Sequence, residues 1–561
     1  MAYFLKQTKL KYGTYLAIYE SHYDKNKKRA VNHNVKSIGN IKTLITEQIS
    51  DPVAYYKSVV DQMNLDAKNK KNYSSSRRID SSPLKYLGYS PFIKILELLD
   101  IKKYFNYLQF AYKFKFSCYD ITKDLIASRL VSPCSKLKTF NEVIPNLFHH
   151  TTSSYDQILE CLDFIGNNYE KIIEFTNVAV KNKYEILTDK VYFDCTNFFF
   201  EIDREDLLRR KGPSKENRSK PIVSMGLLLD SNRIPIGMKI FAGNESEKPV
   251  IRDIINNLKK RNNIKGKTIQ VADKGLNCTE NIVSAILNKD GYIFSKSIKQ
   301  LPDKEIIWLK SENDWKNIYD KQNNLLYKFK SCIDEFPYNI TDINGKKKTV
   351  YIKEKRLLTY NHKLAEKQRY EINRLVEKAR GFCYYNAKKS ECGECGKYIN
   401  FTDNDNIKAK ANINEKAIIN DLELCGYNLL ITSEINMADE EIYDTYHNLW
   451  KIEETFKTMK SELDARPVFV QKKNTITGHF LICYLSVLLL RIFQYLVCKN
   501  EFSVNEIMSF AKKFYVIDVE DDRYINTLSD KPLYTRLSEL LGIPITNYFL
   551  YKKEIDKMVA P

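Results

Sequence analysis

Apolar residues recur at two different spacings along the chain, and the spacing changes near residues 50 and 186. In residues 1–50, apolar and polar positions alternate in segments such as TYLAIYES, which predicts the short strands of a small β unit. In residues 51–186 the apolar residues are mostly three and four positions apart, as in SPFIKILELLDI, which predicts helices. The polar segment KNKKNYSSSRR (68–78) indicates a linker or an exposed basic loop.

Residues 187–299 contain strand-like and helix-like segments in turn, which predict a mixed α/β sheet with helices packed on it. β-branched and aromatic runs indicate strands at 190–202, 222–230, 234–243, 267–273 and 291–298. An amphipathic segment predicts a helix at 248–262. Asn277 and Glu280 have the spacing of a capping box, which predicts the start of a further helix that stops at Gly291.

Residues 300–420 interrupt this alternation and are rich in lysine. The short strand-like segments IIWLK, NLLYKFK and KTVYIKE, with a helix at about 364–380, predict an inserted β-rich subdomain. Strand and helix return in residues 421–500, which we interpret as the second part of the same core. Residues 501–561 are predicted to form a helical C-terminal region.

Residues 446–460, YHNLWKIEETFKTMK, predict one amphipathic helix with two lines of side chains. Apolar residues spaced by three and four form the buried line: Leu449, Ile452, Phe456, Met459 and Leu463. Tyr446, Glu453 and Lys460 recur every seven residues and form a second line, offset by about 80°. Glu453 is thereby placed at the rim of the core, whereas Glu454 points about 100° further round, toward water. An ordinary surface helix with Glu/Lys pairs is the alternative interpretation.

The composition restricts the class of protein. Hydrophobic residues make up 43% of the 561 residues, which is typical of a folded protein rather than a disordered one. The formal net charge of +19 favours a polyanion as partner, nucleic acid first, over a merely solvated basic surface. The N-terminal segment MAYFLKQTKLKYG lacks the apolar core of a signal peptide, and the 12 scattered cysteines favour reduced thiols in a cytoplasm.

Two segments bear on a membrane and on zinc. The apolar run at residues 480–497 is interrupted by Arg491 and Gln494, which favours a buried core helix over a membrane span. Cys392 and Cys395 form a Cys-x-x-Cys pair, but no second close pair is visible in the sequence. Because a structural zinc site needs four ligands, zinc is not expected there.

Two further acids stand within or at the end of strands that are predicted to be buried. Asp194 lies inside the apolar strand at 190–202, and Asp273 ends the strand at 267–273. A buried carboxylate is costly unless it is hydrogen-bonded, paired or bound to a metal. Carboxylates that converge from different elements suit Mg²⁺, and two such ions about 4 Å apart can promote phosphoryl transfer. Hydrogen bonds from backbone amides to each carboxylate are the alternative interpretation.

The order of these acids resembles that of the DDE transposases, which have an RNase H-like, integrase-like catalytic core. In that family one Asp lies on the first strand, a second follows the fourth strand, and a Glu lies on a late helix behind an insertion. Here these positions fall on Asp194, Asp273 and Glu453. The separation of Asp273 from Glu453 is similar to that of the subgroup with a large, mostly β insertion before the last helix.

The late helix also resembles the signature of one group of bacterial insertion-sequence transposases, Tyr-x2-Arg-x3-Glu-x6-Lys. The signature falls on Tyr446, Leu449, Glu453 and Lys460, with Leu449 in the place of the usual Arg. Three longer segments are similar to family segments: GPSKENRSKPIVSMGLLLDSNRIPIGMKIFAGNESE, VADKGLNCTENI and RPVFVQKKNTITGHFLICYLSVLLL. The resemblance covers about residues 185–498.

The resemblance implies a fold and an activity. The fold is an RNase H-like α/β core with a β-rich insertion, a small N-terminal β unit and helical DNA-binding regions, with residues 51–186 binding the DNA ends. The enzyme would bind the inverted-repeat ends of its insertion sequence and catalyse Mg²⁺-dependent cleavage and transfer of DNA strands. Asp194, Asp273 and Glu453 would hold two Mg²⁺ ions, for which Mn²⁺ is a substitute.

The same resemblance implies contacts with DNA phosphates. Tyr446 and Lys460 would touch the phosphate next to the scissile bond, Tyr through a hydroxyl donor and Lys through its charge. Lys457 or Lys451 would supply the cation that is missing at Leu449.

Partners and location follow from the resemblance as well. Trp308 and Trp315 lie in the insertion, where relatives stack an aromatic side chain on a flipped base, and local packing is the alternative. The expected partners are the terminal repeats and target DNA, with a homodimer in the synaptic complex and a cytoplasmic, nucleoid-associated location in a bacterium. Two other functions stay open: a transposase-derived DNA-binding protein without catalysis, and another RNase H-fold nuclease.

Overall fold

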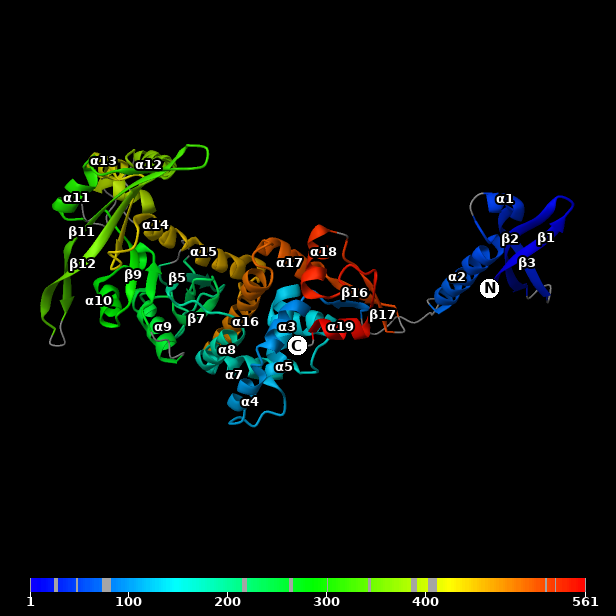
Figure 1. The fold of residues 1–561 in the computed structure, drawn as a ribbon. Helices are drawn as coiled ribbons and strands as arrows, with labels where there is room; N and C mark the ends of the chain where they lie inside the picture. Colours follow the sequence, from blue (N-terminus) through cyan, green and yellow to red (C-terminus); the bar gives the residue numbers. More distant parts are fainter. Residues whose placement is uncertain are drawn as a thin grey trace. The chain divides into compact units, whose positions relative to one another are not determined.

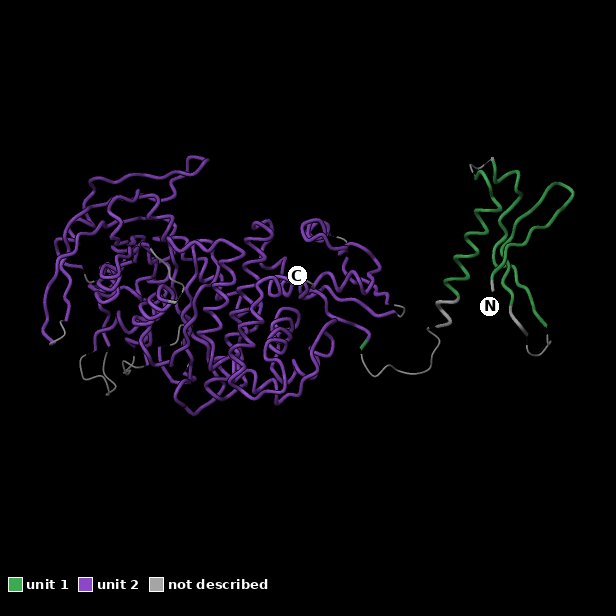
Figure 2. Tube along the Cα trace, turned by 60° about the horizontal axis from the view of Figure 1, so that its bottom comes forward, with its two compact units in different colours: residues 1–82 green, residues 83–561 purple. Residues whose placement is uncertain are grey.

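The computed structural model describes residues 2–24, 29–46, 49–72, 82–213, 219–261, 266–299, 301–341, 345–384, 391–401, 411–519, 522–529 and 531–559. The chain divides into two compact units, residues 1–82 and residues 83–561, which are coloured separately in Figure 2. The apolar pattern predicts limits at residues 50 and 186 instead, so the first unit is longer than the predicted β unit. The finer division into six segments stays a prediction.

In its described residues, the first unit is a three-stranded antiparallel sheet with a long helix. Its elements are β1 (Ala2–Leu10), β2 (Gly13–Asp24), β3 (Arg29–Asn40), α1 (Ile41–Thr46) and α2 (Pro52–Asn72). The Asn64 side chain of α2 accepts from Tyr3 N–H at 2.7 Å and donates to the Tyr3 carbonyl at 2.8 Å, which fixes α2 to β1. The loop predicted at 68–78 is therefore helical as far as Asn72, and its residues 73–78 lie outside the described residues.

Helices dominate the start and the end of the second unit. They are α3 (Ser90–Leu98), α4 (Lys102–Gln109), α5 (Cys118–Val131), α6 (Lys136–Lys138), η1 (Thr139–Val143), η2 (Ile144–Asn146), α7 (Tyr155–Asn167), α8 (Tyr169–Lys183), α16 (Lys473–Arg491), η7 (Ile492–Val497), α17 (Val504–Lys513), α18 (Pro532–Leu541) and α19 (Lys552–Val559). Four short strands form a small sheet: β4 (Leu84–Tyr86), β16 (Tyr515–Asp518), β17 (Arg523–Asn526) and β18 (Phe549–Tyr551). The C-terminal region is thus mixed rather than purely helical.

Helix α16 is the central helix of this region and packs against α5 and α7. Two glycines allow the close approach of α7 and α16, because a Cβ at Gly166 would overlap the Asn474 carbonyl and a Cβ at Gly478 would overlap the Leu162 carbonyl. Together α16 and η7 are long and apolar enough to cross a membrane, yet 83% of the apolar window is buried inside the protein. The prediction of a buried core helix is confirmed.

Among its described residues, the second unit contains a nine-stranded sheet in the order β10-β11-β12-β15-β9-β8-β5-β6-β7 (Figure 1). The strands on its β7 side are β5 (Lys190–Phe199), β6 (Ile222–Leu229), β7 (Pro235–Ala242), β8 (Ile269–Ala272) and β9 (Gly291–Lys296). β8 runs parallel to both β5 and β9, whereas β5, β6 and β7 are antiparallel neighbours. With the helices α9 (Lys248–Arg261) and α10 (Thr279–Leu287), these strands confirm the predicted mixed α/β fold.

The two faces of this sheet belong to different hydrophobic cores. On β5, Val191 and Phe193 pack in the core formed with α9 and α10, whereas Tyr192 and Phe198 pack in the core that contains α16. Because successive side chains of a strand point to opposite faces, Asp194 lies on the face of Tyr192 and Phe198. That face is the one that the late helices cover, since α15 (Trp450–Lys457) contacts β5 and α14 (Asp439–His447) contacts β8 and β9.

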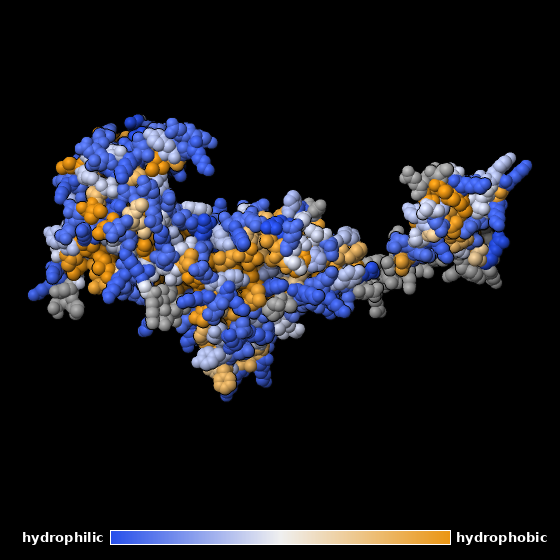
Figure 3. Space-filling view, viewed as in Figure 1, coloured by the Kyte–Doolittle hydropathy of each residue, from blue (hydrophilic) through white to orange (hydrophobic). Residues whose placement is uncertain are grey.

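The residues between β9 and the last strand of the sheet extend that sheet and add helices. Their elements are α11 (Asp303–Lys310), β10 (Lys316–Tyr319), β11 (Leu325–Thr341), β12 (Lys347–Tyr360), α12 (His362–Phe382), η5 (Gly393–Tyr398), β13 (Ile399–Phe401), β14 (Ala411–Ile413), α13 (Glu415–Glu423) and β15 (Tyr427–Thr432). β12 pairs with β15, and β15 pairs with β9, so the insertion continues the core sheet. The surface over α12 and α13 is largely hydrophilic (Figure 3).

One predicted strand of the insertion is wrong. The segment IIWLK lies in helix α11. Pro302 directly precedes this helix, and Asp303 and Glu305 lie in its first turn, where carboxylates interact favourably with the helix dipole. This short apolar run is therefore one face of a helix and not a strand.

Candidate active site

The segment predicted as one helix at 446–460 folds as two helices with a tight turn between them. α14 (Asp439–His447) ends before α15 (Trp450–Lys457), and the π-helical turn η6 (Thr458–Glu462) follows. At the break, Leu449 N–H donates to the Tyr446 carbonyl at 2.9 Å, and Ile452 N–H donates to the Leu449 carbonyl at 3.0 Å. These are the shorter bonds of a 3₁₀ turn. The prediction of one regular helix is therefore wrong, because a tightened and a widened turn interrupt the α-helical ladder.

The predicted apolar line of this segment is confirmed. Its members are all buried: Leu449, Ile452, Phe456, Met459 and Leu463. Leu449 is only 7% exposed, so a guanidinium at this position would enter an apolar environment, which is costly without a partner. The departure of Leu449 from the family signature thus fits the packing of this core.

The two strand acids lie at the same level of neighbouring strands. β5 and β8 pair in parallel with Phe193 opposite Ala272, and Asp194 and Asp273 are the next residues of the two strands. Asp194 is half-buried, and its Oδ1 accepts from Cys195 N–H at 2.7 Å. Asp273 follows the end of β8 and is half-buried as well. The backbone alone thus brings two carboxylates together at one end of the parallel strands.

Tyr446 of α14 connects the late helices to the end of β8, where Asp273 lies. Its hydroxyl donates to Asp273 Oδ1 at 3.1 Å. Burial and the charges of Asp273 and Glu453 raise the pKa of Tyr446, so the phenol stays neutral and keeps its proton as a donor. The Tyr446 hydroxyl thus binds Asp273 in this structure, and its contact with a DNA phosphate stays a prediction.

Ser295 of β9 is a further neighbour of the Tyr446 hydroxyl, and its hydrogen bond lowers the pKa of Tyr446 against these effects. The Asn277 side-chain amide donates to the Ser295 carbonyl at 2.9 Å. The predicted capping box at Asn277 and Glu280 is wrong, because α10 follows Cys278 and Asn277 is bonded to β9 instead.

Glu453 and Lys460 complete the predicted second line. Glu453 is exposed, and its charge acts on the Tyr446 hydroxyl, which itself binds Asp273. Lys460 is half-buried, and its Nζ lies 5.4 Å from the centre of the Phe198 ring. Phe198 is on the same face of β5 as Asp194, so the line from Tyr446 to Lys460 crosses from the end of β8 to β5.

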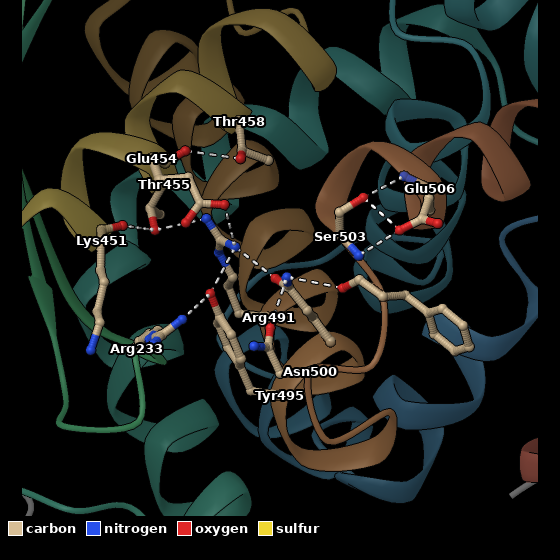
Figure 4. Close-up of polar contacts among 12 residues, drawn as sticks. Arg233, Lys451, Glu454, Thr455, Thr458, Arg491, Tyr495, Asn500, Ser503 and Glu506 are labelled. Carbon is tan, nitrogen blue, oxygen red and sulfur yellow. Dashed lines mark hydrogen bonds and ion pairs between the residues drawn. The ribbon is translucent and has the colours of Figure 1, made fainter. Parts of the chain in front are cut away.

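The sequence predicts that Glu454 points toward water, but the structure pairs its carboxylate with an arginine. Its Oε1 lies 3.5 Å from Nη1 of Arg491, a fully buried residue of α16 (Figure 4). Arg491 also donates to the Gln494 side chain at 2.6 Å and to the Thr455 hydroxyl at 3.2 Å. Arg491 entered the prediction only as an interruption of an apolar run. A charge inside an otherwise apolar helix was the available signal of a buried ion pair.

The donor types of this site fit a divalent cation with a preference for oxygen ligands. Asp194, Asp273 and Glu453 offer carboxylate oxygens, which suit Mg²⁺. As the side chains stand, no group of three His, Cys, Asp or Glu residues within the described ranges is close enough to hold a metal ion. One Asp273 oxygen is bonded to Tyr446 and one Asp194 oxygen to a backbone amide.

A cleft of about 380 Å³ begins at Lys274, next to Asp273, and is lined mainly by residues of β9, α12 and α13. Its lining contains five lysines, Lys274, Lys296, Lys299, Lys367 and Lys397, with the two acids Glu371 and Asp421. Lys274 directly follows Asp273 in the chain. Apart from Lys296 and Lys299, these lysines are far apart in the sequence, and no sequence pattern predicts that they share one cleft.

The two tryptophans of the insertion are half-buried and pack in a small core with Leu309. Lys330 Nζ lies 5.2 Å from the Trp308 ring centre and 4.9 Å from that of Trp315. Trp315 Nε1 donates to the Ser311 carbonyl at 3.1 Å. Both indoles thus have local partners, and stacking on a base stays a prediction. Lys457 is exposed on α15, as a phosphate contact requires.

Cys392 and Cys395 are buried and belong to a small core with Cys425. Cys395 Sγ donates to the Cys392 carbonyl at 3.0 Å. Such contacts are ordinary for packed free thiols, and the expectation about zinc stays a prediction.

Comparison with known proteins adds a family to this geometry. The family model described as "Transposase DDE domain" matches residues 199–489, a segment that contains Asp273 and Glu453 and starts just after Asp194. No curated protein matches the chain. Among solved structures, a piggyBac transposase in a synaptic complex with hairpin DNA is 12% identical over 86% of each chain. The TM-score of 0.35 is too low to support an inference about this chain. Because the family match spans more than half of the 561 residues, the chain belongs to the DDE transposase family and is a transposase.

Proposed function

We propose that this transposase binds the inverted-repeat ends of an insertion sequence and cleaves and transfers DNA strands at a site formed by Asp194, Asp273 and Glu453. The observation that carries the proposal is the register of β5 and β8, which brings Asp194 and Asp273 to one level. Tyr446 then ties the helices that bear Glu453 to the same edge through its bond to Asp273.

The strand order supports an RNase H-like core. In the sheet order, β7-β6-β5-β8-β9 is a continuous run in which β5 is the first strand along the chain and β8 is the fourth. Asp194 thus lies on the first strand and Asp273 after the fourth, as the resemblance to DDE transposases implies. The insertion then separates β9 from β15 and the helices with Glu453.

Each residue of the site has a role that its contacts support. Asp194, Asp273 and Glu453 would hold Mg²⁺ ions, which supply activation of an attacking oxygen and stabilisation of a leaving one. Tyr446 orients Asp273 through its hydroxyl, and the half-buried Lys460 next to β5 can contact a DNA phosphate beside Asp194. The exposed Lys457 is available to a more distant phosphate.

The lysine-lined cleft beside Asp273 supports DNA as the substrate. Its lining has five lysines against two acids, and a duplex backbone is attracted by such an excess of positive charge. Trp308 and Trp315 belong to the same insertion and are candidates for stacking on a base near the cleaved bond. A homodimer that joins two DNA ends, at the nucleoid of a bacterial cytoplasm, completes the proposal.

The test uses the purified full-length protein and a DNA fragment that carries the coding sequence with its flanking ends. Wild type should nick at the ends only when Mg²⁺ is added. Asp194→Asn and Asp273→Asn should bind the ends as wild type does and nick at least ~10³-fold more slowly, because removing a metal ligand costs several kcal/mol of transition-state stabilisation. Asp253→Asn, at an exposed position of α9, is the matched control and should nick normally.

Three results would change the proposal. Normal nicking by Asp194→Asn would show that the proposed acids are not the site. Nicking that does not depend on the end sequence would favour another RNase H-fold nuclease. End binding by wild type without any nicking would favour a DNA-binding protein derived from a transposase.

A further inference from the structure

A second cluster of charged residues lies around α15 and contains Lys451, Arg233, Glu454 and Arg491 (Figure 4). Lys451 is two residues before Glu453 and thus about 200° round the helix from it. Arg233, from the turn between β6 and β7, lies next to Lys451. Glu454 of the same helix is bonded to the buried Arg491 of α16. These four residues comprise three cations and one carboxylate, an excess of two positive charges when Lys451 is protonated.

The single carboxylate of the cluster, Glu454, already has a cationic partner. Glu454 pairs with Arg491, which is fully buried and donates further to Gln494, Thr455 and the Tyr495 hydroxyl. A buried guanidinium needs such a counter-charge, because its desolvation is otherwise uncompensated. Glu454 and Arg491 are thus a matched pair, and the excess charge belongs to Arg233 and Lys451.

Arg233 is held in place by aromatic rings and not by an acid. Its guanidinium carbon lies 4.8 Å from the ring centre of Tyr495 and 5.8 Å from that of Trp450, and Nη1 donates to the Tyr495 hydroxyl at 3.2 Å. Within the described parts of the chain, no carboxylate forms an ion pair with Arg233. Its backbone has a φ of 69°, a left-handed conformation that is unusual for a residue other than glycine. The guanidinium is therefore fixed in orientation and left without a counter-charge.

Lys451 adds a second unneutralised cation beside it. The residue is only 9% exposed, and its ammonium has no hydrogen-bond or ion-pair partner among the described residues. Two neighbouring cations that lack an acid destabilise the free protein, and an anion between them would relieve this cost.

We infer that Arg233 and Lys451 bind a phosphate of the DNA, with the exposed Trp450 as one wall of the site, on the flank of α15 opposite the acids. The fork of an arginine and the point charge of a lysine are the usual pair for phosphate oxygens. Trp450 is 51% exposed, which leaves part of its indole free for a sugar or a base next to that phosphate. The inference rests on the proposed function, since it names a DNA contact of the same enzyme outside its reacting centre.

The test measures DNA binding without divalent metal, so that catalysis plays no part. The probes are a duplex with the terminal repeat that flanks the coding sequence and a duplex of scrambled sequence. Lys451→Met and Arg233→Met should each bind both duplexes about 10-fold more weakly and reduce the slope of log K against log salt by about 0.9, as the loss of one phosphate contact predicts. Lys553→Met, which removes an exposed charge on α19, is the matched control and should behave as wild type.

Thermal unfolding separates a binding lysine from a structural one. Lys451→Met should raise the Tm of the free protein, because it removes a cation that lies beside Arg233 without an acid partner, while it weakens DNA binding. A variant that lost stability and affinity together would overturn the inference. So would wild-type affinity and salt slope in both Lys451→Met and Arg233→Met in an enzyme that still nicks DNA, and the proposed function would then stand alone.

Two further outcomes concern the ligand. If inorganic phosphate raised the Tm of wild type but not of Lys451→Met, while the DNA affinities of the two agreed, the site would bind a free anion and the assignment to DNA would be wrong. If wild type bound neither duplex, the inference and the proposed function would both fall.

Discussion

The two flanks of α15 carry neighbouring glutamates with different surroundings. Glu453 is exposed and lies next to the Tyr446 hydroxyl that binds Asp273, whereas Glu454 is bound to a fully buried arginine. One flank gathers carboxylates and the other gathers cations. By our proposals the first flank binds a metal cation and the second binds a phosphate. Glu453 is then a proposed metal ligand, whereas Glu454 is the counter-charge of Arg491.

The largest expected effect separates these two glutamates by activity. Glu453→Gln should slow end nicking by at least ~10³-fold, because it removes a proposed metal ligand. Glu454→Gln keeps an oxygen toward Arg491 and should slow nicking by less than ~10-fold. Single-turnover nicking assays of both variants provide the measurement. Equal losses in the two variants would mean that the flanks do not differ in the way described.

A substitution toward the family signature should be harmful here. Leu449→Arg introduces a guanidinium at a position that is 7% exposed, and we expect a loss of about 3 kcal/mol in the free energy of unfolding. Leu449→Met, which conserves volume, should cost less than about 1.5 kcal/mol. Denaturant unfolding measures both. A stable Leu449→Arg protein with faster nicking would show that this position can accept the usual residue of the group.

The cation flank can be tested through stability. Glu454→Ala should lower the free energy of unfolding by about 3 kcal/mol, because it leaves Arg491 buried without its counter-charge. Adding Arg491→Met should restore part of this loss, since the double variant contains neither charge. Denaturant unfolding of the single and double variants gives the coupling. If the losses in unfolding free energy of the two single variants simply added in the double variant, the ion pair would make no measurable contribution to stability.

The bond between Tyr446 and Asp273 should have a smaller effect on the rate. Tyr446→Phe removes the donor to Asp273 Oδ1, and a hydrogen bond to a charged group of about 1.5 kcal/mol corresponds to roughly 10-fold slower nicking. Tyr443→Phe is the control on the same helix, because Tyr443 stacks on Tyr327 through its ring at 3.7 Å. Indistinguishable nicking rates in these two variants would remove Tyr446 from the site.

The smallest expected effect is a pH dependence of stability on the cation flank. The pKa of Lys451 is lowered from 10.5 to about 8, so between these values the unfolded chain binds more protons than the folded protein, and stability rises with pH. The Tm of Lys451→Met should exceed that of wild type by about 1–2 °C below pH 8, and the difference should vanish above about pH 10.5. A constant difference across this range would mean that Lys451 does not titrate in this way.

Local patterns were sufficient for much of the core. The strands around Asp194 and Asp273 were predictable because β-branched and aromatic runs favour extended backbone. The buried line from Leu449 to Leu463 was predictable because apolar spacing reports which helix face avoids water. The break between α14 and α15 was not predictable from the sequence. The residues at the break permit a regular helix, and the tightened turn depends on packing against the sheet.

The sequence by itself determined the order of the three acids, the alternating strands and helices that carry them, and the charge excess that favours DNA. Only the tertiary structure decided which partner each charge meets. Glu454 meets Arg491, and Lys451 meets Arg233, although the partners are distant in the chain. The physical reason is that element formation depends on local periodicity, whereas the environment of a charge depends on which distant elements pack around it.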